Sequence, residues 1–221
     1  MNKLGLIALV LAVACGGTSA GPENPDPDLG NDAPTALEEP ASKVDIAVDD
    51  RYQFSLPDLE GTAHSFAANK GKLVVVEWFN PQCPFVKYAY NQDKGPLRGM
   101  ARREIDKGDV VWFAINSGAP GKQGHDLDVN QVAHNGWEMA QPILRDVDGK
   151  VGRAYGAKST PHVFVFGKEL ELIYKGALDN APLGKANGEY MNYVAAALEA
   201  ARSGDKPAVE ETPSYGCGVK Y

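Results

Sequence analysis

The chain has 221 residues, enough for one full-sized domain and too few for two large ones. Its 22 Lys and Arg residues against 29 Asp and Glu residues give a net charge of −7. Because phosphate contacts need clustered basic residues, this balance argues against nucleic-acid binding. Three cysteines are too few for a small disulfide-dense scaffold.

The N-terminal segment 1–14 is predicted to be a signal peptide. Lys3 supplies a positive charge, and the run from Leu4 to Ala14 is almost entirely apolar. This run is shorter than the roughly 20 residues that span a bilayer, and its length is typical of a secretory signal. We therefore expect an exported protein, in which disulfides are permitted.

Cys15 is the candidate lipid-attachment site. The segment Ala12-Val13-Ala14-Cys15 resembles a bacterial lipobox, whose cysteine is lipidated and becomes the new N-terminus. The resemblance implies a membrane-anchored lipoprotein that faces the periplasm. By resemblance to enterobacterial lipoprotein sorting, Gly16 in the place of an Asp after the cysteine implies the outer membrane. The alternative is an ordinary signal peptide with an incidental cysteine.

Residues 15–42 combine the lipid-attachment site with an acidic linker. From 16 to 42 the chain has six acidic residues, five of its 15 prolines and neither Lys nor Arg. Such a composition buries too little apolar surface to offset the entropy of ordering, so the linker is predicted to be disordered. Residues 43–221 then form the globular domain.

The domain alternates strands and helices. The apolar, β-branched run 73–79 is typical of a central strand that is buried on both faces. The alternation predicts an α/β fold in which a mixed sheet lies between layers of helices. In chain order we predict a hairpin of strands at 52–56 and 64–66, a strand at 73–79, helices from 84 and at 97–106, and a strand at 110–115. A helix at 129–138, a strand at 142–145 and a helix at 151–155 follow. A second hairpin at 162–166 and 170–174, a helix at 189–203 and an irregular tail at 204–221 complete the domain.

Cys83 is the candidate nucleophile. It lies where a predicted strand ends and a helix begins, and unpaired N–H groups and the helix dipole favour a thiolate there. Pro84 suits the first helical turn, which needs no N–H. The alternative is a buried structural cysteine. The turn sequence Asn80-Pro81-Gln82 favours a sulfur near the surface.

A second feature is Pro161, in the segment Ser159-Thr160-Pro161-His162 directly before a predicted strand. Proline at the start of a strand is unusual unless it shapes a special turn. A strand, then Cys-Pro-Phe-Val at a helix start, then Thr-Pro before a hairpin, resembles the thioredoxin fold over residues 44–221. The closest resemblance is to peroxiredoxin-like redoxins allied to the alkyl hydroperoxide reductase and thiol-specific antioxidant group. It rests on segments 83–87, 114–117, 154–157, 176–180 and 211–221.

This resemblance implies a thioredoxin-like three-layer sandwich with a mixed central sheet, an N-terminal hairpin and an irregular C-terminal tail. It also implies that the Thr160–Pro161 bond is cis and faces Cys83. Neither a cofactor nor a metal is predicted.

The chain departs from these families at positions that matter for function. Val86 replaces the second cysteine of Cys-x-x-Cys, and Asn80 and Val76 replace the Thr and Pro of typical peroxiredoxins. No arginine stands beside Thr160-Pro161 to steady a peroxide. Asn80 retains a hydrogen-bond donor, but these departures disfavour efficient peroxidase chemistry.

Cys217 is the candidate resolving thiol. It lies between Gly216 and Gly218 in the tail, and glycines permit close backbone approach. If the tail crosses the helix after Cys83, the two thiols can form a redox pair. The alternatives are a static staple and a free thiol. A bridge requires Cα atoms within roughly 7 Å.

Two further residues are predicted near Cys83. His162 follows Pro161 and would complete a copper or zinc site only with a second cysteine in the Cys83 loop, which is missing. An inward polar neighbour is therefore the favoured interpretation. Trp78 is interpreted as a core aromatic beside the site.

These observations predict an exported redoxin-like thiol–disulfide oxidoreductase with antioxidant-type chemistry. Cys83 attacks a disulfide or, less efficiently, a peroxide, and Cys217 resolves the intermediate. Pro161 shapes the surface opposite Cys83, with Asn80, Thr160, Trp78 and His162 in support. The expected partners are protein thiols and disulfides or a small peroxide, an external thiol reductant, and a membrane reached through the Cys15 lipid. The alternatives are a lipoprotein thiol peroxidase and a non-catalytic thioredoxin-fold binding module with a Cys83–Cys217 staple.

Overall fold

The computed structural model describes residues 49–186 and 188–221. The predicted signal peptide, the lipid-attachment site Cys15 and the linker up to residue 42 lie outside the described residues. Within the described part of the chain, no helix is long and apolar enough to cross a membrane.

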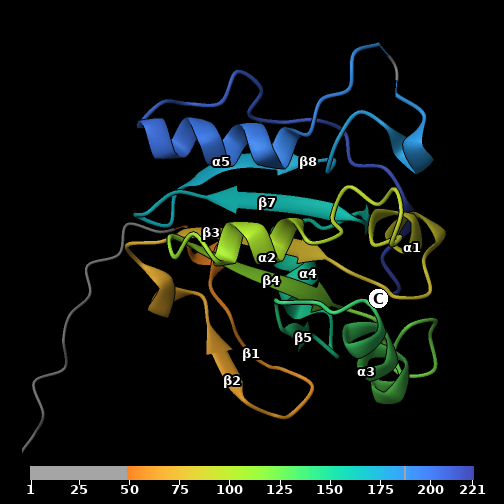
Figure 1. The fold of residues 1–221 in the computed structure, drawn as a ribbon. Helices are drawn as coiled ribbons and strands as arrows, with labels where there is room; N and C mark the ends of the chain where they lie inside the picture. The colour runs from red at the N-terminus through yellow and green to blue at the C-terminus, as the bar shows by residue number, and fades with distance from the viewer. Residues whose placement is uncertain (1–48, 187) are drawn as a thin grey trace, which may run out of the picture. The chain divides into compact units, whose positions relative to one another are not determined.

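A five-stranded mixed sheet forms the centre of the domain (Figure 1). Its strands are β3 (Leu73–Trp78), β4 (Val110–Asn116), β5 (Ile143–Arg145), β7 (His162–Phe166) and β8 (Leu172–Gly176). In the order β5-β4-β3-β7-β8, the pairs β5–β4 and β4–β3 are parallel, and the pairs β3–β7 and β7–β8 are antiparallel. The sheet is therefore mixed, as the sequence predicted.

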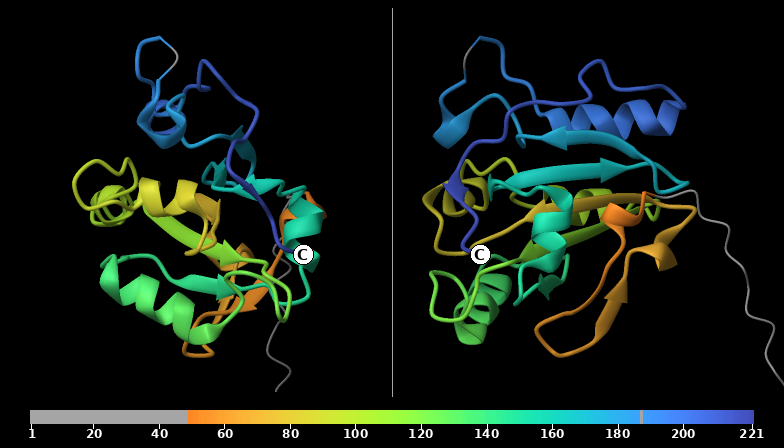
Figure 2. Two further views of the ribbon diagram at one scale, coloured as in Figure 1. Left: turned by 90° about the vertical axis from the view of Figure 1, so that its right-hand side faces the viewer. Right: turned by 180° about the vertical axis from the view of Figure 1, so that it is seen from behind.

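Helices cover both faces of this sheet (Figure 2). One face carries α1 (Pro84–Ala89), α2 (Met100–Ile105), α3 (Leu127–Gly136) and α5 (Tyr193–Ser203). The other face carries α4 (Lys150–Tyr155) and the antiparallel hairpin of β1 (Ser55–Pro57) and β2 (Ala63–Ser65). Three short 3-10 turns complete the list: η1 (Asp50–Tyr52), η2 (Ala67–Asn69) and η3 (Pro182–Gly184).

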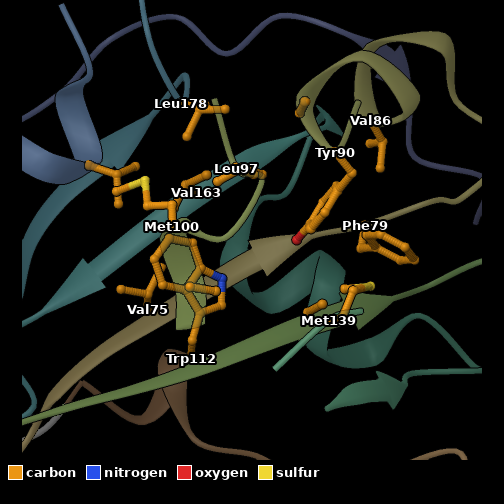
Figure 3. Packing of buried hydrophobic residues seen from close by; sticks show 14 of the residues in the cluster. Val75, Phe79, Val86, Tyr90, Leu97, Met100, Trp112, Met139, Val163 and Leu178 are labelled. Atoms are coloured by element: carbon orange, nitrogen blue, oxygen red, sulfur yellow. The ribbon is translucent and has the colours of Figure 1, made fainter. Parts of the chain in front are cut away.

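Two hydrophobic clusters hold the layers together. Strand β3 supplies both, because successive side chains of a strand point to opposite faces of the sheet. Val75 belongs to the cluster under α1, α2 and α5, part of which Figure 3 shows with Trp112 and Met100. Val76 belongs to the opposite cluster, with Phe164. All of β3 is buried, which explains its uninterrupted apolar run.

This three-layer arrangement, with an N-terminal hairpin, is the thioredoxin-like fold that the sequence predicted. The principal difference lies in the tail, which was predicted to be irregular. It contains a short strand, β9 (Cys217–Gly218), which pairs antiparallel with β6 (Ser159–Thr160) in a separate two-stranded sheet.

Several element boundaries also differ from the prediction, for local reasons. α2 begins at Met100 and not at 97, because Gly99 precedes it in the left-handed conformation. α5 begins at Tyr193 and not at 189, because the Asn192 side chain caps it by accepting from the N–H of Ala195. β8 starts two residues later than predicted, because Leu170 takes a positive φ in the preceding turn.

Candidate functional site

Cys83 lies directly after the central strand, at the start of α1. The backbone carbonyl of Asn80 accepts from the N–H of Cys83 at 3.0 Å, and the Asn80 side-chain oxygen accepts from the N–H of Gln82 at 2.9 Å. These bonds form a tight turn that ends β3 and starts the helix. Cys83 is the N-cap of α1, and Pro84 occupies its first turn, as the sequence predicted.

The turn before Cys83 is fastened to a second loop. The Asn80 amide nitrogen donates to the carbonyl of Gln123 at 3.1 Å, and the N–H of Gly124 donates to the Gln82 side chain at 2.9 Å. The described hydrogen bonds of the Asn80 amide thus go to Gln82 and Gln123. In this structure Asn80 positions the Cys83 turn, and none of its described hydrogen bonds reaches the thiol.

Thr160 meets Cys83 from a distant part of the sequence. The Thr160–Pro161 peptide bond is cis, which confirms that prediction. The Cys83 thiol donates to the carbonyl oxygen of Thr160 at 3.1 Å. Residues 77 positions apart in the sequence thereby meet at the sulfur atom.

The tail brings Cys217 to the same place. Strand β9 pairs with β6 so that Cys217 lies opposite Thr160 and Gly218 lies opposite Ser159. Gly216 has a φ of 129°, and a Cβ atom there would overlap the carbonyl oxygen of Thr160. That oxygen is also the acceptor of the Cys83 thiol, so only a glycine lets the tail backbone approach this closely.

Hydrogen bonds hold the tail along much of its length. The Tyr215 hydroxyl donates to the buried carboxylate of Asp179 at 2.6 Å, and the Tyr215 ring packs against Phe85 of α1. Farther along, the Tyr221 hydroxyl donates to the carbonyl of Ala157 at 2.9 Å. The tail is therefore a docked element of the domain, and it passes over the start of α1.

Cys83 and Cys217 both adjoin Thr160, and their electrostatic environments differ. Burial alone would raise the pKa of the Cys83 thiol. Hydrogen bonds from the Cys217 thiol, the Thr160 hydroxyl and the backbone N–H groups of Val86 and Cys217 outweigh burial, so the pKa of Cys83 lies below its ordinary value. Burial and the neighbouring Cys83 raise the pKa of Cys217. Cys83 is therefore the cysteine of the pair that ionises more readily.

The two thiols also differ in exposure. The Cys83 side chain has 0% relative exposure and belongs to the hydrophobic cluster under α1. Cys217 is partly exposed. Both cysteines are free thiols in this structure.

His162 lies on the other face of the sheet from Cys83. Its ring packs against Phe164, a member of the opposite cluster, at a centroid distance of 4.5 Å. The Nδ1 atom accepts from the N–H of Lys158 at 3.3 Å. Burial, with the charges of Lys158 and Lys175, lowers the pKa of His162 to about 4. His162 is thus a neutral imidazole, and the expectation that it adjoins Cys83 is corrected by the alternation of side chains along β7.

Trp78 is a core residue, as interpreted from the sequence. It is fully buried, its indole N–H donates to the Ser117 hydroxyl at 3.0 Å, and its ring packs against Tyr155 and Phe164. Among the described residues, no group of three or more His, Cys, Asp and Glu side chains could hold a metal ion.

Sequence reasoning missed one buried acid, Glu77. It lies on the Cys83 side of β3, where its carboxylate accepts from the Tyr90 hydroxyl at 2.7 Å and the Trp112 indole at 3.4 Å. Its Oε1 atom has no hydrogen-bond partner, and burial raises the pKa of Glu77 to about 7. A single charged residue inside the apolar run 73–79 was the available signal.

Comparisons with known proteins find structural neighbours only. Neither a family model nor a curated protein matches the chain. A hypothetical protein from Sinorhizobium meliloti is 27% identical, with a TM-score of 0.64 over 76% of this chain and 91% of that one. An uncharacterized conserved protein from Geobacillus kaustophilus is 26% identical, with a TM-score of 0.66 over 76% of this chain and 88% of that one.

A further neighbour covers less of the chain. It is a secreted Mycobacterium tuberculosis disulfide oxidoreductase homologous to E. coli DsbE, 19% identical, with a TM-score of 0.44 over 57% of this chain and 84% of that one.

Proposed function

We propose that this protein is a thiol–disulfide oxidoreductase whose redox pair is Cys83 and Cys217. The observation that carries the proposal is the convergence of both cysteines on Thr160: the Cys83 thiol donates to the Thr160 carbonyl at 3.1 Å, and Cys217 lies opposite Thr160 in the pairing of β6 with β9. The pKa of Cys83 is lowered there and that of Cys217 is raised. A reactive dithiol needs one sulfur that ionises readily and a second within reach. The lowered pKa of Cys83 and the place of Cys217 opposite Thr160 support both conditions without a Cys-x-x-Cys motif.

The proposed reaction is a two-electron exchange. The two thiols of the protein are oxidised to a Cys83–Cys217 disulfide, while an external disulfide is reduced to two thiols. Run in the opposite direction, an external dithiol or two thiols reduce the bridge. Protein thiols and disulfides are the proposed substrates, and an external thiol is the proposed reductant.

Reduction potential tests this proposal against a structural staple. The full chain carrying Cys15→Ser, so that only the redox pair bears thiols, is equilibrated in glutathione buffers and its bridge is quantified by alkylation and mass spectrometry. We expect one two-electron transition between about −120 and −270 mV, the range of redox-active pairs, whereas structural disulfides lie below about −300 mV. A bridge that resists reduction at −300 mV, or one that never forms, contradicts the proposal.

A peroxide is a second candidate oxidant, supported by the lowered pKa of Cys83. Cys83 thiolate would attack hydrogen peroxide to give a sulfenic acid and hydroxide, and Cys217 would condense with it to release water and form the bridge. No arginine is among the described residues that hydrogen-bond to Cys83 or shift its pKa. The Cys217→Ser variant tests this candidate. Without a resolving thiol, its Cys83 should accumulate in an over-oxidised form as peroxide is consumed.

The proposed place of action is the periplasmic side of a membrane, through lipid attachment at Cys15. The signal-like segment 1–14 and the acidic linker support this part of the proposal. Membrane fractionation tests it: wild type should pellet with membranes, and Cys15→Ser should be soluble or incompletely processed. A soluble wild type that begins after Ala20 contradicts lipid attachment.

A further inference from the structure

We infer that Cys217, and not Cys83, is the cysteine that exchanges with external thiols and disulfides, and that Cys83 exchanges only with Cys217. This inference rests on the proposed redox pair and assigns the order of events within it. It reverses the order expected from the sequence, in which Cys83 made the first attack.

Access is the first argument. Cys83 has 0% relative exposure and is enclosed by the Thr160 carbonyl, the start of α1 and the docked tail. Cys217 is partly exposed, on a strand of two residues that pairs on one side only. In the docked state, a protein or peptide sulfur meets Cys217 first.

The geometry of exchange is the second argument. A thiolate attacks a disulfide sulfur along the line of the S–S bond, from the side opposite the sulfur that leaves. Attack on Cys83 would therefore come from the side away from Cys217, and Cys83 is a fully buried member of the cluster that contains Phe79 and Val86. Cys217 packs against the edge of the same cluster and is only partly buried, so its sulfur is the more open to attack.

The leaving group is the third argument. When an external thiolate attacks the bridged Cys217, a new bond forms between the two sulfurs, the Cys83–Cys217 bond breaks, and Cys83 leaves as a thiolate. The Val86 N–H and the Thr160 hydroxyl stabilise that thiolate. Since the more stable thiolate leaves faster, the site favours Cys83 as the leaving sulfur. A second external thiolate then attacks the external sulfur of the mixed disulfide. This step forms an external disulfide and frees Cys217.

The opposite direction follows the same path. Cys217 passes its proton to the Cys83 thiolate and attacks an external disulfide, which gives a mixed disulfide on Cys217 and one external thiolate. That thiolate takes the proton from Cys83. Cys83 then attacks Cys217 and expels the second external thiolate, which completes the bridge.

The test locates the first mixed disulfide in the otherwise wild-type sequence. The bridged full chain carrying Cys15→Ser is mixed briefly with reduced glutathione, quenched with acid, alkylated and digested. We expect glutathione on the Cys217 peptide in at least about tenfold excess over the Cys83 peptide. Equal labelling, or an excess on Cys83, overturns the inference while leaving the redox pair intact. Failure to form the bridge at all overturns both.

Single-cysteine variants provide an independent measurement with oxidised glutathione as the probe. Both carry Cys15→Ser. Cys217 in the Cys83→Ser chain should react at least about tenfold faster than Cys83 in the Cys217→Ser chain, after each rate is divided by that of the urea-unfolded chain. Adding Gly216→Ala to Cys217→Ser should displace the tail and raise the rate of Cys83, whereas adding Gly218→Ala should not. A Cys83 that reacts as fast as Cys217 with the tail docked overturns the inference.

Discussion

Ionisation of Cys83 is set by hydrogen bonds that outweigh burial. One of these donors, the Thr160 hydroxyl, can be removed by a conservative substitution that keeps both cysteines. Thr160→Val keeps the shape of the side chain and should raise the pKa of Cys83, because an unassisted buried thiolate is disfavoured. Thr160→Ser keeps the hydroxyl and should leave the pKa near that of wild type. Thiolate absorbance against pH, in the Cys15→Ser chain, measures both. Equal titration of the Val and Ser variants would contradict this role.

Glu77 should make the protein less stable as the pH rises. Its pKa is about 7 in the folded chain and ordinarily 4.5, so between these values the folded state holds a proton that the unfolded state has lost. Stability should therefore fall by about 3 kcal/mol from pH 4.5 to pH 7. Glu77→Gln removes this titration. The free energy of unfolding in urea is measured for both proteins at pH 5 and pH 8. The value for Glu77→Gln minus that for wild type should be larger at pH 8 than at pH 5. An unchanged difference would show that Glu77 does not titrate in this range.

His162 should make the protein less stable as the pH falls, in a pH range that overlaps the titration of Glu77. Its pKa is about 4 in the folded chain and ordinarily 6.5, so the unfolded state takes up a proton first as the pH falls. Stability should drop by about 3 kcal/mol from pH 6.5 to pH 4. His162→Asn keeps an acceptor for the N–H of Lys158 and removes the titration. Urea unfolding of wild type and variant at pH 4 and pH 7 measures the effect. Wild type should lose more stability than the variant on going to pH 4, and equal losses would contradict this role of His162.

At the scale of elements, the pairing of β6 with β9 controls the site. Gly216→Ala adds a Cβ atom against the Thr160 carbonyl at a positive φ, which should destabilise the docked tail by about 1–3 kcal/mol. Gly218 lies on the other side of Cys217, and the only atom near an added Cβ there is the Lys158 carbonyl oxygen at 4.0 Å. Gly218→Ala should therefore change stability by less than about 0.5 kcal/mol.

Iodoacetamide labelling of Cys83, together with urea unfolding, distinguishes these two glycines. Labelling should be faster in Gly216→Ala and close to wild type in Gly218→Ala. If Gly216→Ala neither speeds labelling nor lowers stability, the tail does not depend on its close approach to Thr160.

The sequence predicted the main sheet because its strands carry local signals. The runs at 73–79 and 110–115 are apolar and β-branched, and each became a central strand. Strands β6 and β9 have two residues each and exist only through their pairing with one another. No local pattern predicts such a long-range pair, although the glycines around Cys217 marked the place where the tail approaches another backbone.

The site was predictable where a residue type has a special backbone role. Pro161 and the cysteine at a helix start both have such roles, and the cis bond follows the family resemblance. His162 was placed wrongly because nearness in sequence to Pro161 outweighed the alternation of side chains along β7. Glu77 was missed because burial of its carboxylate depends on Tyr90 and Trp112, which are distant in the sequence.

For the whole molecule, oxidation should raise stability strongly. A Cys83–Cys217 bridge closes a loop of about 130 residues, for which chain-entropy reasoning gives about 5 kcal/mol of stabilisation, less any strain in the folded state. The midpoint of urea unfolding should therefore be higher for the oxidised than for the reduced protein. Cys217→Ser, as control, should not respond to oxidant. Equal midpoints for the oxidised and reduced wild type would mean that the bridge distorts the fold.

The docking of the tail against the start of α1 also determines how the domain would respond to mechanical force. Every strand of the central sheet except β3 lies between Cys83 and Cys217, so the bridge would turn most of the domain into a covalent ring. In optical tweezers attached at residues 49 and 221, the reduced chain would release its full length on unfolding. The oxidised chain would withhold about 400 Å or more of extended polypeptide, at about 3.3–3.6 Å per residue. The length released in a single pull would then report the redox state of one molecule.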